Sequence, residues 1–239
     1  MTALLEARSI VFDHGQPPFV THVLRDLSLA IHPGELTVLM GPSGSGKTTL
    51  ISILAGLLRP TSGTVELAGE RLTDLDDAAI TAARRRSLGF VFQAFHLFDA
   101  LSAVDNVAEI LALSGTPIRE ARARARELLV RFGLGERLAH RPGQLSAGQR
   151  QRVAIARALA PGPKIVIADE PTVALDGSTA KSVMKLLREY VSGGTAVLLV
   201  THDTRLVEPT DRVVAIEDGR IVRDGRTAIA SRRGGEEEE

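Results

Sequence analysis

One eight-residue stretch constrains the fold of this chain more than any other. It reads GPSGSGKT from Gly41 to Thr48, with an apolar run before it at 35–40 and a helical pattern after it at 47–58. Glycines in such a loop let backbone N–H groups point at phosphate oxygens, and the helix start adds positive potential. A glycine-rich turn that only caps a helix is the alternative, but the flanking strand and helix favour a phosphate loop.

This loop predicts a nucleotide site that also uses Mg²⁺. Lys47 is expected to reach the β- and γ-phosphates, and Thr48 to offer its hydroxyl to Mg²⁺. The residues expected to hold the nucleotide here are Gly41, Pro42, Ser43, Gly44, Ser45, Gly46, Lys47, Thr48 and Thr49.

The pattern of apolar runs indicates an α/β fold. Besides 35–40, strands are expected at 64–67, 88–92, 164–168 and 196–200, and a longer apolar run covers 24–31. Nearly continuous apolar strands that alternate with helices are typical of a parallel sheet covered on both faces. Helical patterns are expected at 104–113, at 118–132, from Ser146 onward, and at 178–190.

We therefore expect a P-loop NTPase core with a mainly parallel sheet and an inserted α-helical subdomain. A length of 239 residues fits one domain with a subdomain. The domain is expected at 1–230, with its core at 1–92 and 153–230 and the helical subdomain at about 93–152. The acidic tail at 231–239 is expected to be disordered.

Composition argues against several other classes of protein. Lys+Arg 29 balances Asp+Glu 29, so the chain has no net positive charge to attract nucleic acid. Aromatic residues make up 3%, which leaves few rings on which bases could stack. It has no cysteine, which excludes disulfides, thiol catalysis and cysteine-bound metals. No apolar run approaches the length of a membrane span and no signal peptide is recognisable, so we expect the chain to stay in the cytoplasm.

Two strands end in polar residues that suit phosphate chemistry. The strand at 164–168 runs into Asp169, which could hold Mg²⁺, and Glu170, which could take a proton from water attacking the γ-phosphate. The alternative is that these acids and the proline after them only turn the chain. The strand at 196–200 leads to His202, which would lie at the same sheet edge and could orient that water. A lone histidine is more often structural.

A further stretch, QLSAGQRQRVAIARAL from Gln144 to Leu159, reads as a helix start capped by Ser146. Its small residues leave N–H groups exposed at a positive helix end, a phosphate site without its own lysine. Together with Gln93, these ordered motifs resemble the ATPase subunit of ATP-binding-cassette (ABC) transporters, over most of the chain. GPSGSGKTTL, FQAFHL and LSAGQRQRVAIARAL are most similar to subunits of lipoprotein-release, macrolide-export and glycolipid-export systems.

The resemblance implies that an N-terminal antiparallel β portion accompanies the mainly parallel sheet. It also implies an ATPase that sits on the cytoplasmic side of the cell membrane and powers a separate integral membrane permease. Two chains, a homodimer or a pseudo-symmetric pair, would sandwich two ATP molecules head to tail. Phe12 would stack on adenine, Gln93 would sense Mg²⁺ and the γ-phosphate, and Leu175 and Asp176 would connect the two sites. The nucleotide of the second chain would be contacted by Ser146, Ala147, Gly148 and Gln149.

The chain departs from the family pattern at a few of these positions. Ala147 stands where the family usually has glycine, Phe12 replaces the commoner tyrosine, and a frequent polar residue is missing at Val173 or Ala174. Because both Glu170 and His202 are present, hydrolysis is still expected.

Two other functions remain open at this point. The first is a soluble ABC-type ATPase in DNA repair, chromosome organisation or translation, although such relatives typically carry a coiled-coil insertion or two fused cassettes. The second is a nucleotide-dependent scaffold without turnover. The arginines at 119–131 are interpreted as a solvated face rather than a nucleic-acid site. Those at 84–86 are interpreted as a polar connection between two strands that needs no ligand, and the other histidines lack the spacing of a transition-metal site.

Phenylalanines gather just beyond Gln93. Phe90 and Phe92 alternate as in a strand and are expected in the core, whereas Phe95 and Phe98 follow the strand. We expect this pair to form a partly exposed patch on which the permease docks and which ATP binding moves. The alternative is that both rings fill the seam beneath the helical subdomain.

Overall fold

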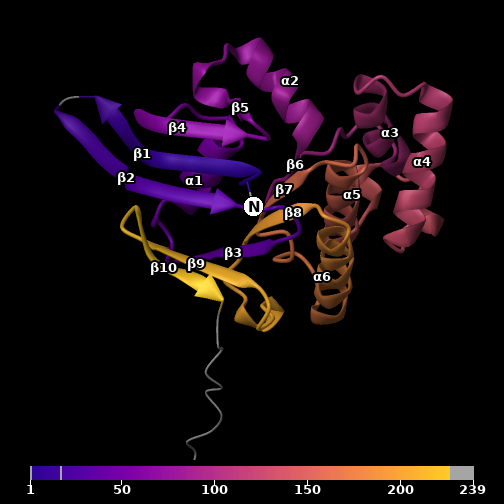
Figure 1. Ribbon diagram of the computed structural model, residues 1–239. Coiled ribbons are helices and arrows are strands. Elements are labelled where there is room, and N and C mark those ends of the chain that lie inside the picture. The colour runs from indigo at the N-terminus through magenta and orange to yellow at the C-terminus, as the bar shows by residue number, and fades with distance from the viewer. Residues whose placement is uncertain (1, 17, 227–239) are drawn as a thin grey trace, which may run out of the picture.

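The computed structural model describes residues 2–16 and 18–226, so the predicted tail at 231–239 lies outside the described residues. Its larger sheet has the order β10-β9-β3-β8-β7-β6 (Figure 1). Neighbouring strands from β9 to β6 are parallel, and β10 pairs antiparallel with β9 at the edge. The strands are β3 (Leu36–Met40), β6 (Leu88–Val91), β7 (Ile165–Asp169), β8 (Ala196–Val200), β9 (Arg212–Glu217) and β10 (Arg220–Arg226).

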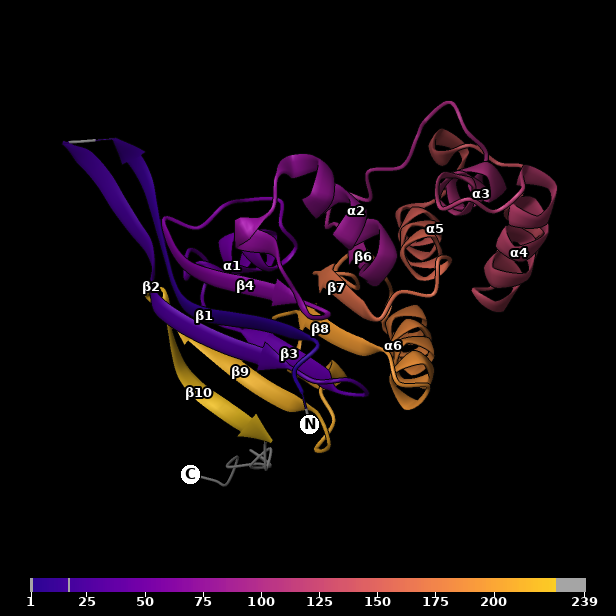
Figure 2. The same cartoon turned by 45° about the horizontal axis from the view of Figure 1, so that its top comes forward.

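A second sheet is wholly antiparallel and has the order β2-β1-β4-β5. It contains β1 (Leu5–Gln16), β2 (Phe19–Ile31), β4 (Ser62–Leu67) and β5 (Glu70–Arg71). The first two strands form a long hairpin that projects from the body (Figure 2). The predicted N-terminal antiparallel β portion is thus present, and β2 begins well before the apolar run at 24–31.

The large sheet is buried on both faces. Along each central strand, successive side chains point to opposite faces and join different cores. On β7, Ile165 and Ile167 join a cluster with helix α1 (Lys47–Leu54) and the antiparallel sheet. Val166 and Ala168 join the opposite cluster, which includes α5 (Ala147–Leu159) and α6 (Gly177–Ser192). This two-sided burial explains why the central strands are apolar at nearly every position.

The inserted helices lie beside the sheet, where α3 (Ala103–Leu113) and α4 (Ile118–Arg131) pack with α5 (Figure 2). Asn106 on α3 is fully buried, and its amide N–H groups donate to Phe98 O at 3.1 Å and Leu101 O at 3.2 Å. The Phe98 N–H donates to Asn106 Oδ1 at 2.8 Å. These hydrogen bonds hold the backbone of the segment after Gln93 to α3. Short 3₁₀ helices occur at η1 (Leu72–Asp74), η2 (Gly135–Arg137), η3 (Pro142–Gln144) and η4 (Thr204–Leu206).

The predicted helix at 47–58 is too long, because α1 ends at Leu54. Gly56 has φ +62°, and the Leu57 N–H donates to Ser52 O at 2.8 Å, so the chain turns out of the helix. A Cβ at Gly56 would lie 2.8 Å from Ile80 Cγ2, which also requires glycine here.

A second correction concerns the arginine-rich connection at 84–86, which belongs to helix α2 (Asp77–Ser87). The Asp76 carboxylate accepts from the Ala79 N–H at 2.8 Å and caps the helix start. Only Ile80, Ala83 and Ser87 are buried, so the sequence has little apolar periodicity here. The sequence signal that could have indicated this helix is Asp76, because aspartate is favoured at a helix N-cap.

Candidate functional site

The predicted phosphate loop opens into a pocket of about 630 Å³, here termed the loop pocket. The pocket lies at the carboxyl ends of β3, β7 and β8, the sheet edge at which open α/β sheets bind ligands. It is lined by Val23, Gly41, Ser43, Gly44, Gly46, Lys47, Thr48, Thr49, Gln93, Asp169, Glu170, Val200 and His202.

The loop itself takes a shape that only glycine allows at two positions. Gly46 has φ +99°, and a Cβ there would lie 2.8 Å from Leu24 Cδ2. A Cβ at Gly41 would lie 2.1 Å from the carbonyl oxygen of Ile216. The Lys47 ammonium donates to the carbonyls of Gly41 at 2.8 Å and Pro42 at 2.7 Å, which holds its positive charge over the loop.

Two acids stand side by side where β7 ends. Burial and the neighbouring charge of Glu170 raise the pKa of Asp169, and the positive charge of Lys47 acts in the opposite direction. Glu170 has φ +49°, a conformation that costs a non-glycine residue about 1–3 kcal/mol and that is concentrated at functional sites. Its N–H donates to Val200 O at 3.0 Å, which fixes the backbone of Glu170 beside the end of β8.

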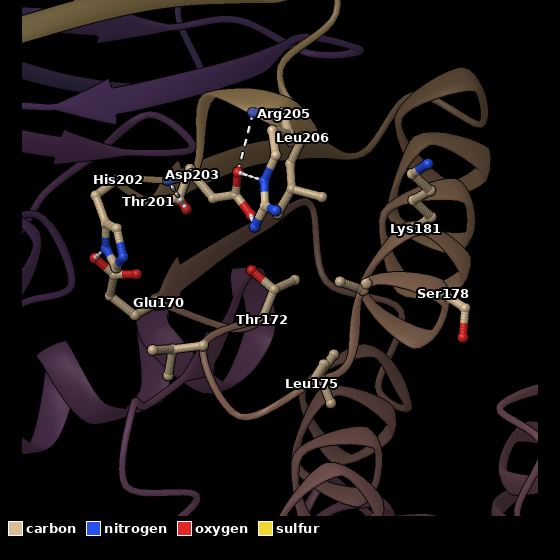
Figure 3. Close-up of a pocket in the computed structure, with 13 residues that line it drawn as sticks. Glu170, Thr172, Leu175, Ser178, Lys181, Thr201, His202, Asp203, Arg205 and Leu206 are labelled. Carbon is tan, nitrogen blue, oxygen red and sulfur yellow. Dashed lines mark hydrogen bonds and ion pairs between the residues drawn. The ribbon is translucent and has the colours of Figure 1, made fainter.

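Glu170 and His202 contact each other directly across the ends of β7 and β8 (Figure 3). His202 Nδ1 lies 2.9 Å from Glu170 Oε1. The hydrogen bond to this carboxylate, and then its negative charge, raise the pKa of His202. The ion pair between the imidazolium and the carboxylate is therefore lost as the pH rises through that raised pKa. The two groups expected to act on water thus form one unit.

This pairing predicts that Glu170→Gln lowers the pKa of His202 toward the ordinary value of 6.5. A neutral amide cannot supply the carboxylate charge that stabilises the imidazolium. The measurement is an NMR pH titration of the histidine ring signals, with His202 assigned by comparison with His202→Gln. Glu127→Gln, which changes an exposed glutamate on α4, should leave the titration in place. An unshifted His202 in Glu170→Gln would show that the pair does not form in solution.

A second pocket of about 730 Å³ shares Glu170 and His202 with the loop pocket (Figure 3). Its other walls come from the chain between Thr172 and Gly177, from the start of α6 and from η4. Glu170 and His202 thus stand between two open spaces, one beside the phosphate loop and one beside α6.

Comparison with known proteins decides the family. The family model described as "ABC transporter" matches residues 24–173. The chain belongs to the ABC transporter family. It is an ATP-binding cassette and an ABC ATPase of that family, and the resemblance and fold class predicted from the sequence are confirmed.

Two curated relatives illustrate the similarity. The cassette is 48% identical over 221 residues to the lipoprotein-releasing system ATP-binding protein LolD of Pseudomonas syringae pv. tomato, covering 92% of this chain and 97% of LolD. It is 45% identical over 224 residues to the macrolide export ATP-binding/permease protein MacB 1 of Yersinia pestis bv. Antiqua, covering 94% of this chain. The cassette spans only 34% of the length of that MacB.

A solved structure is similar along almost the whole chain. It is described as the dimeric structure of a post-hydrolysis state of the ATP-binding cassette MJ0796 bound to ADP and Pi. The TM-score is 0.88 at 39% sequence identity, and the alignment covers 93% of this chain and 98% of the other.

The cassette structure does not bring all predicted site residues into the loop pocket. Phe12 pairs with Leu24 across the hairpin and packs half-buried against the core around α1, outside the described lining. Pro42 contributes its carbonyl to Lys47, and Ser45 is buried. Val23 lines the pocket instead, and sequence analysis missed it because the expected apolar run began one residue later.

The four predicted contacts to a second nucleotide also lie outside the loop pocket, at the start of α5. Ser146 Oγ accepts from the Gln149 N–H at 3.2 Å, and Gln149 Oε1 accepts from the Ser146 N–H at 2.9 Å. Ala147 and Gly148 are the first two residues of the helix, and a Cβ at Gly148 would lie 3.2 Å from Leu175 Cδ2. This capping box leaves the positive start of α5 outside the loop pocket that Lys47 lines.

Asp176 is predicted to connect the two nucleotide sites of a dimer, but its carboxylate bonds to the start of its own helix, α6. Its carboxylate accepts from the Ser178 N–H at 3.1 Å, the Thr179 N–H at 3.0 Å and the Thr179 hydroxyl at 2.7 Å. These bonds and the one from the Ser178 hydroxyl lower the pKa of Asp176 strongly. The side chain therefore caps α6 in this structure.

Proposed function

We propose that the cassette hydrolyses ATP with Mg²⁺ in the loop pocket, as one half of a head-to-tail dimer that powers a membrane permease. One observation carries this proposal: Lys47, Asp169, Glu170 and His202 come from three separate parts of the chain and line a single pocket. A cation for phosphate, an acid for a metal and an acid–histidine pair for water are together what phosphoryl transfer to water requires.

The loop pocket has suitable donors for Mg²⁺. The Thr48 hydroxyl, the Gln93 amide and the Asp169 carboxylate all line it, and Mg²⁺ prefers oxygen ligands of this kind. Because burial raises the pKa of Asp169, a bound cation would offset the cost of its charge. When bound, Mg²⁺ neutralises charge on the β- and γ-phosphates.

In the proposed mechanism, the phosphate-loop N–H groups and Lys47 hold the β- and γ-phosphates at the start of α1. Glu170 takes a proton from water as the water oxygen attacks the γ-phosphorus and the bond to the β-phosphate oxygen breaks. His202, held by Glu170 at 2.9 Å, keeps the attacking water and the γ-phosphate in line. The products are ADP and phosphate.

The proposed dimer completes each site with residues of the other chain. Ser146, Ala147, Gly148 and Gln149 lie at a helix start, which suits an anion, and outside the loop pocket of their own chain. The similar MJ0796 cassette is described as dimeric with ADP and Pi bound, which supports a dimer here. Two chains related head to tail would bring each helix start to the other chain's nucleotide.

The proposed permease contact lies beyond Gln93. Phe98 is 48% exposed, and its backbone is fixed by Asn106. Phe95 is half-buried, with the Arg150 guanidinium 5.4 Å from the centre of its ring. The predicted patch is therefore carried mainly by Phe98. Among described residues no helix is long and apolar enough to cross a membrane. The names of LolD and MacB, which refer to lipoprotein release and macrolide export, support a transport partner.

We expect Phe98→Asp to abolish co-purification with the permease and stimulation of ATPase activity by it, while the isolated cassette stays folded. An aspartate on an exposed contact removes apolar area and adds a charge that must lose water on docking. Val130→Asp changes a similarly exposed apolar residue on α4 and is the matched control. Unfolding of isolated Phe98→Asp would favour the core role of this ring, and unchanged coupling would refute the docking role.

Phosphate release by the purified cassette tests the proposed activity. We expect release from ATP that stops when EDTA removes Mg²⁺ and returns when Mg²⁺ is added in excess. Binding of ATP without any release would instead support the scaffold alternative.

A further inference from the structure

A basic hollow of about 330 Å³, here termed the lysine trough, lies between α6 and η4. It is lined by Lys181, Met184, Lys185, Arg188, Arg205, Leu206 and Glu208. The trough shares Lys181, Arg205 and Leu206 with the second pocket. That pocket also contains Glu170 and His202 (Figure 3). A charged occupant of the trough would therefore lie close to the proposed hydrolytic pair.

The unpaired positive charge of the trough belongs to its two lysines. Each arginine is already paired with carboxylates of the same chain. The pairs are Arg188 with Asp211 at 2.6 Å, Arg188 with Glu208 at 3.2 Å, and Arg205 with Asp203 at 2.8 Å. Lys181 and Lys185 are exposed, and neither forms an ion pair within residues 2–16 and 18–226. Because they are four residues apart on α6, both side chains lie on the same face of the helix.

The chain beyond β10 leaves the fold near one end of the trough. Arg226, the last residue of β10, pairs with Arg212 of β9. Asp211 precedes Arg212, and its carboxylate accepts from the Arg188 guanidinium at 2.6 Å. Consecutive Cα atoms are about 3.8 Å apart, and paired Cα atoms of antiparallel strands about 4.5–5.5 Å apart. Arg226 therefore lies within about 10 Å of Asp211, next to the Arg188 end of the trough.

An acidic segment of the same chain is long enough to reach the lysines. Four glutamates follow one another at 236–239, outside the described residues. They are joined to the end of β10 by the nine residues of 227–235, which span up to about 30 Å when extended. Along α6, Lys181 lies about 10 Å from Arg188. Both lysines are therefore within reach of the glutamates.

The order of charges along this segment agrees with the order of charges along the trough. Arg232 and Arg233 come before the glutamates in the sequence. In the trough, the acidic Glu208 pairs with Arg188, and the two lysines lie further from β10 along α6. A chain that runs from β10 along the trough would bring its arginines to Glu208 and its glutamates to the lysines.

We infer that the glutamates at 236–239 bind the lysine trough of their own chain and lower the affinity of the cassette for ATP. In this position the negative segment lies beside the pocket of Glu170 and His202, where it repels an anionic nucleotide. Exposed ion pairs are individually weak, but a tethered segment has an effective concentration in the millimolar range. Docking is therefore reversible and sensitive to salt. The effect on ATP rests on the proposed function, whereas the docking does not.

Docking is tested by NMR on the full chain. Because the sequence has no cysteine, Gly235→Cys carries a nitroxide label at one position beside the glutamates. The comparison is the same labelled chain with Glu→Gln at all of 236–239, here termed the neutral variant. We expect stronger broadening of the α6 amide signals around Lys181 and Lys185 in the chain that keeps its glutamates. Lys181→Glu combined with Lys185→Glu should abolish the difference, whereas Arg124→Glu, at an exposed arginine on α4, should preserve it.

Two results of this experiment would overturn the docking. The first is equal broadening with and without the four glutamates at low salt. The second is broadening of the same size in an isotope-labelled chain without nitroxide that is mixed with a nitroxide-labelled chain, because the segment would then bind a second copy.

The rate of phosphate release tests the effect on ATP. At low salt, the neutral variant should have a KM for ATP roughly two- to fivefold lower than wild type with an unchanged kcat, because a repulsive charge near the nucleotide is removed. The difference should disappear at high salt, which screens exposed charges. An unchanged KM at low salt would overturn the effect on ATP affinity. If neither chain releases phosphate, the proposed function fails, and the labelling experiment still decides the docking.

Discussion

Glu170→Gln should bind ATP but hydrolyse it roughly 10²–10⁴-fold more slowly than wild type, the range typical of lost general acid–base catalysis. The amide keeps the shape of the side chain but cannot accept the proton of the attacking water. Because hydrolysis is expected to separate the two chains, the variant should also accumulate as an ATP-bound dimer. Steady-state phosphate release and light scattering with and without ATP measure the two effects.

Glu127→Gln controls for the removal of a carboxylate, since Glu127 is exposed on α4 and outside both pockets. It should hydrolyse ATP at the wild-type rate and should not become trapped as a dimer. Normal steady-state hydrolysis by Glu170→Gln would remove Glu170 from the mechanism, whatever the oligomeric state.

The central strands could be predicted from the sequence because their burial leaves a local mark. Strands β3, β7 and β8 are covered on both faces, so almost every residue is apolar and turns bound each run. Helix α2 left no such mark, because it lies on the surface and buries only one narrow side. Apolar periodicity in a sequence thus indicates elements that bury much of their surface. It does not indicate elements, such as α2, that bury little.

Most residues that line the loop pocket could be predicted from the sequence, but the contacts between them could not. The phosphate loop and the acids after β7 follow from motif and strand order. The hydrogen bond between Glu170 and His202 depends on the pairing of β7 with β8 and on the positive φ of Glu170.

Lys47→Ala and Ser146→Arg should each abolish most ATPase activity, but through opposite halves of the composite site. Loss of Lys47 removes a positive charge from the phosphates, an effect of roughly 10²–10³-fold by analogy with other electrostatic donors. Arginine at Ser146 disrupts the capping box and places a bulky side chain where the second chain's nucleotide should lie. Lys185→Ala, at an exposed lysine on α6, and the milder Ser146→Ala are the matched controls.

The activity of mixed variants tests the head-to-tail arrangement most directly. Lys47→Ala and Ser146→Arg chains with different affinity tags are combined, and heterodimers are isolated through both tags in sequence. In each heterodimer, one site should pair the intact phosphate loop of the Ser146→Arg chain with the intact helix start of the Lys47→Ala chain. The account predicts that phosphate release returns in these heterodimers and is absent from both homodimers. Isolated heterodimers that stay as inactive as the homodimers would contradict it.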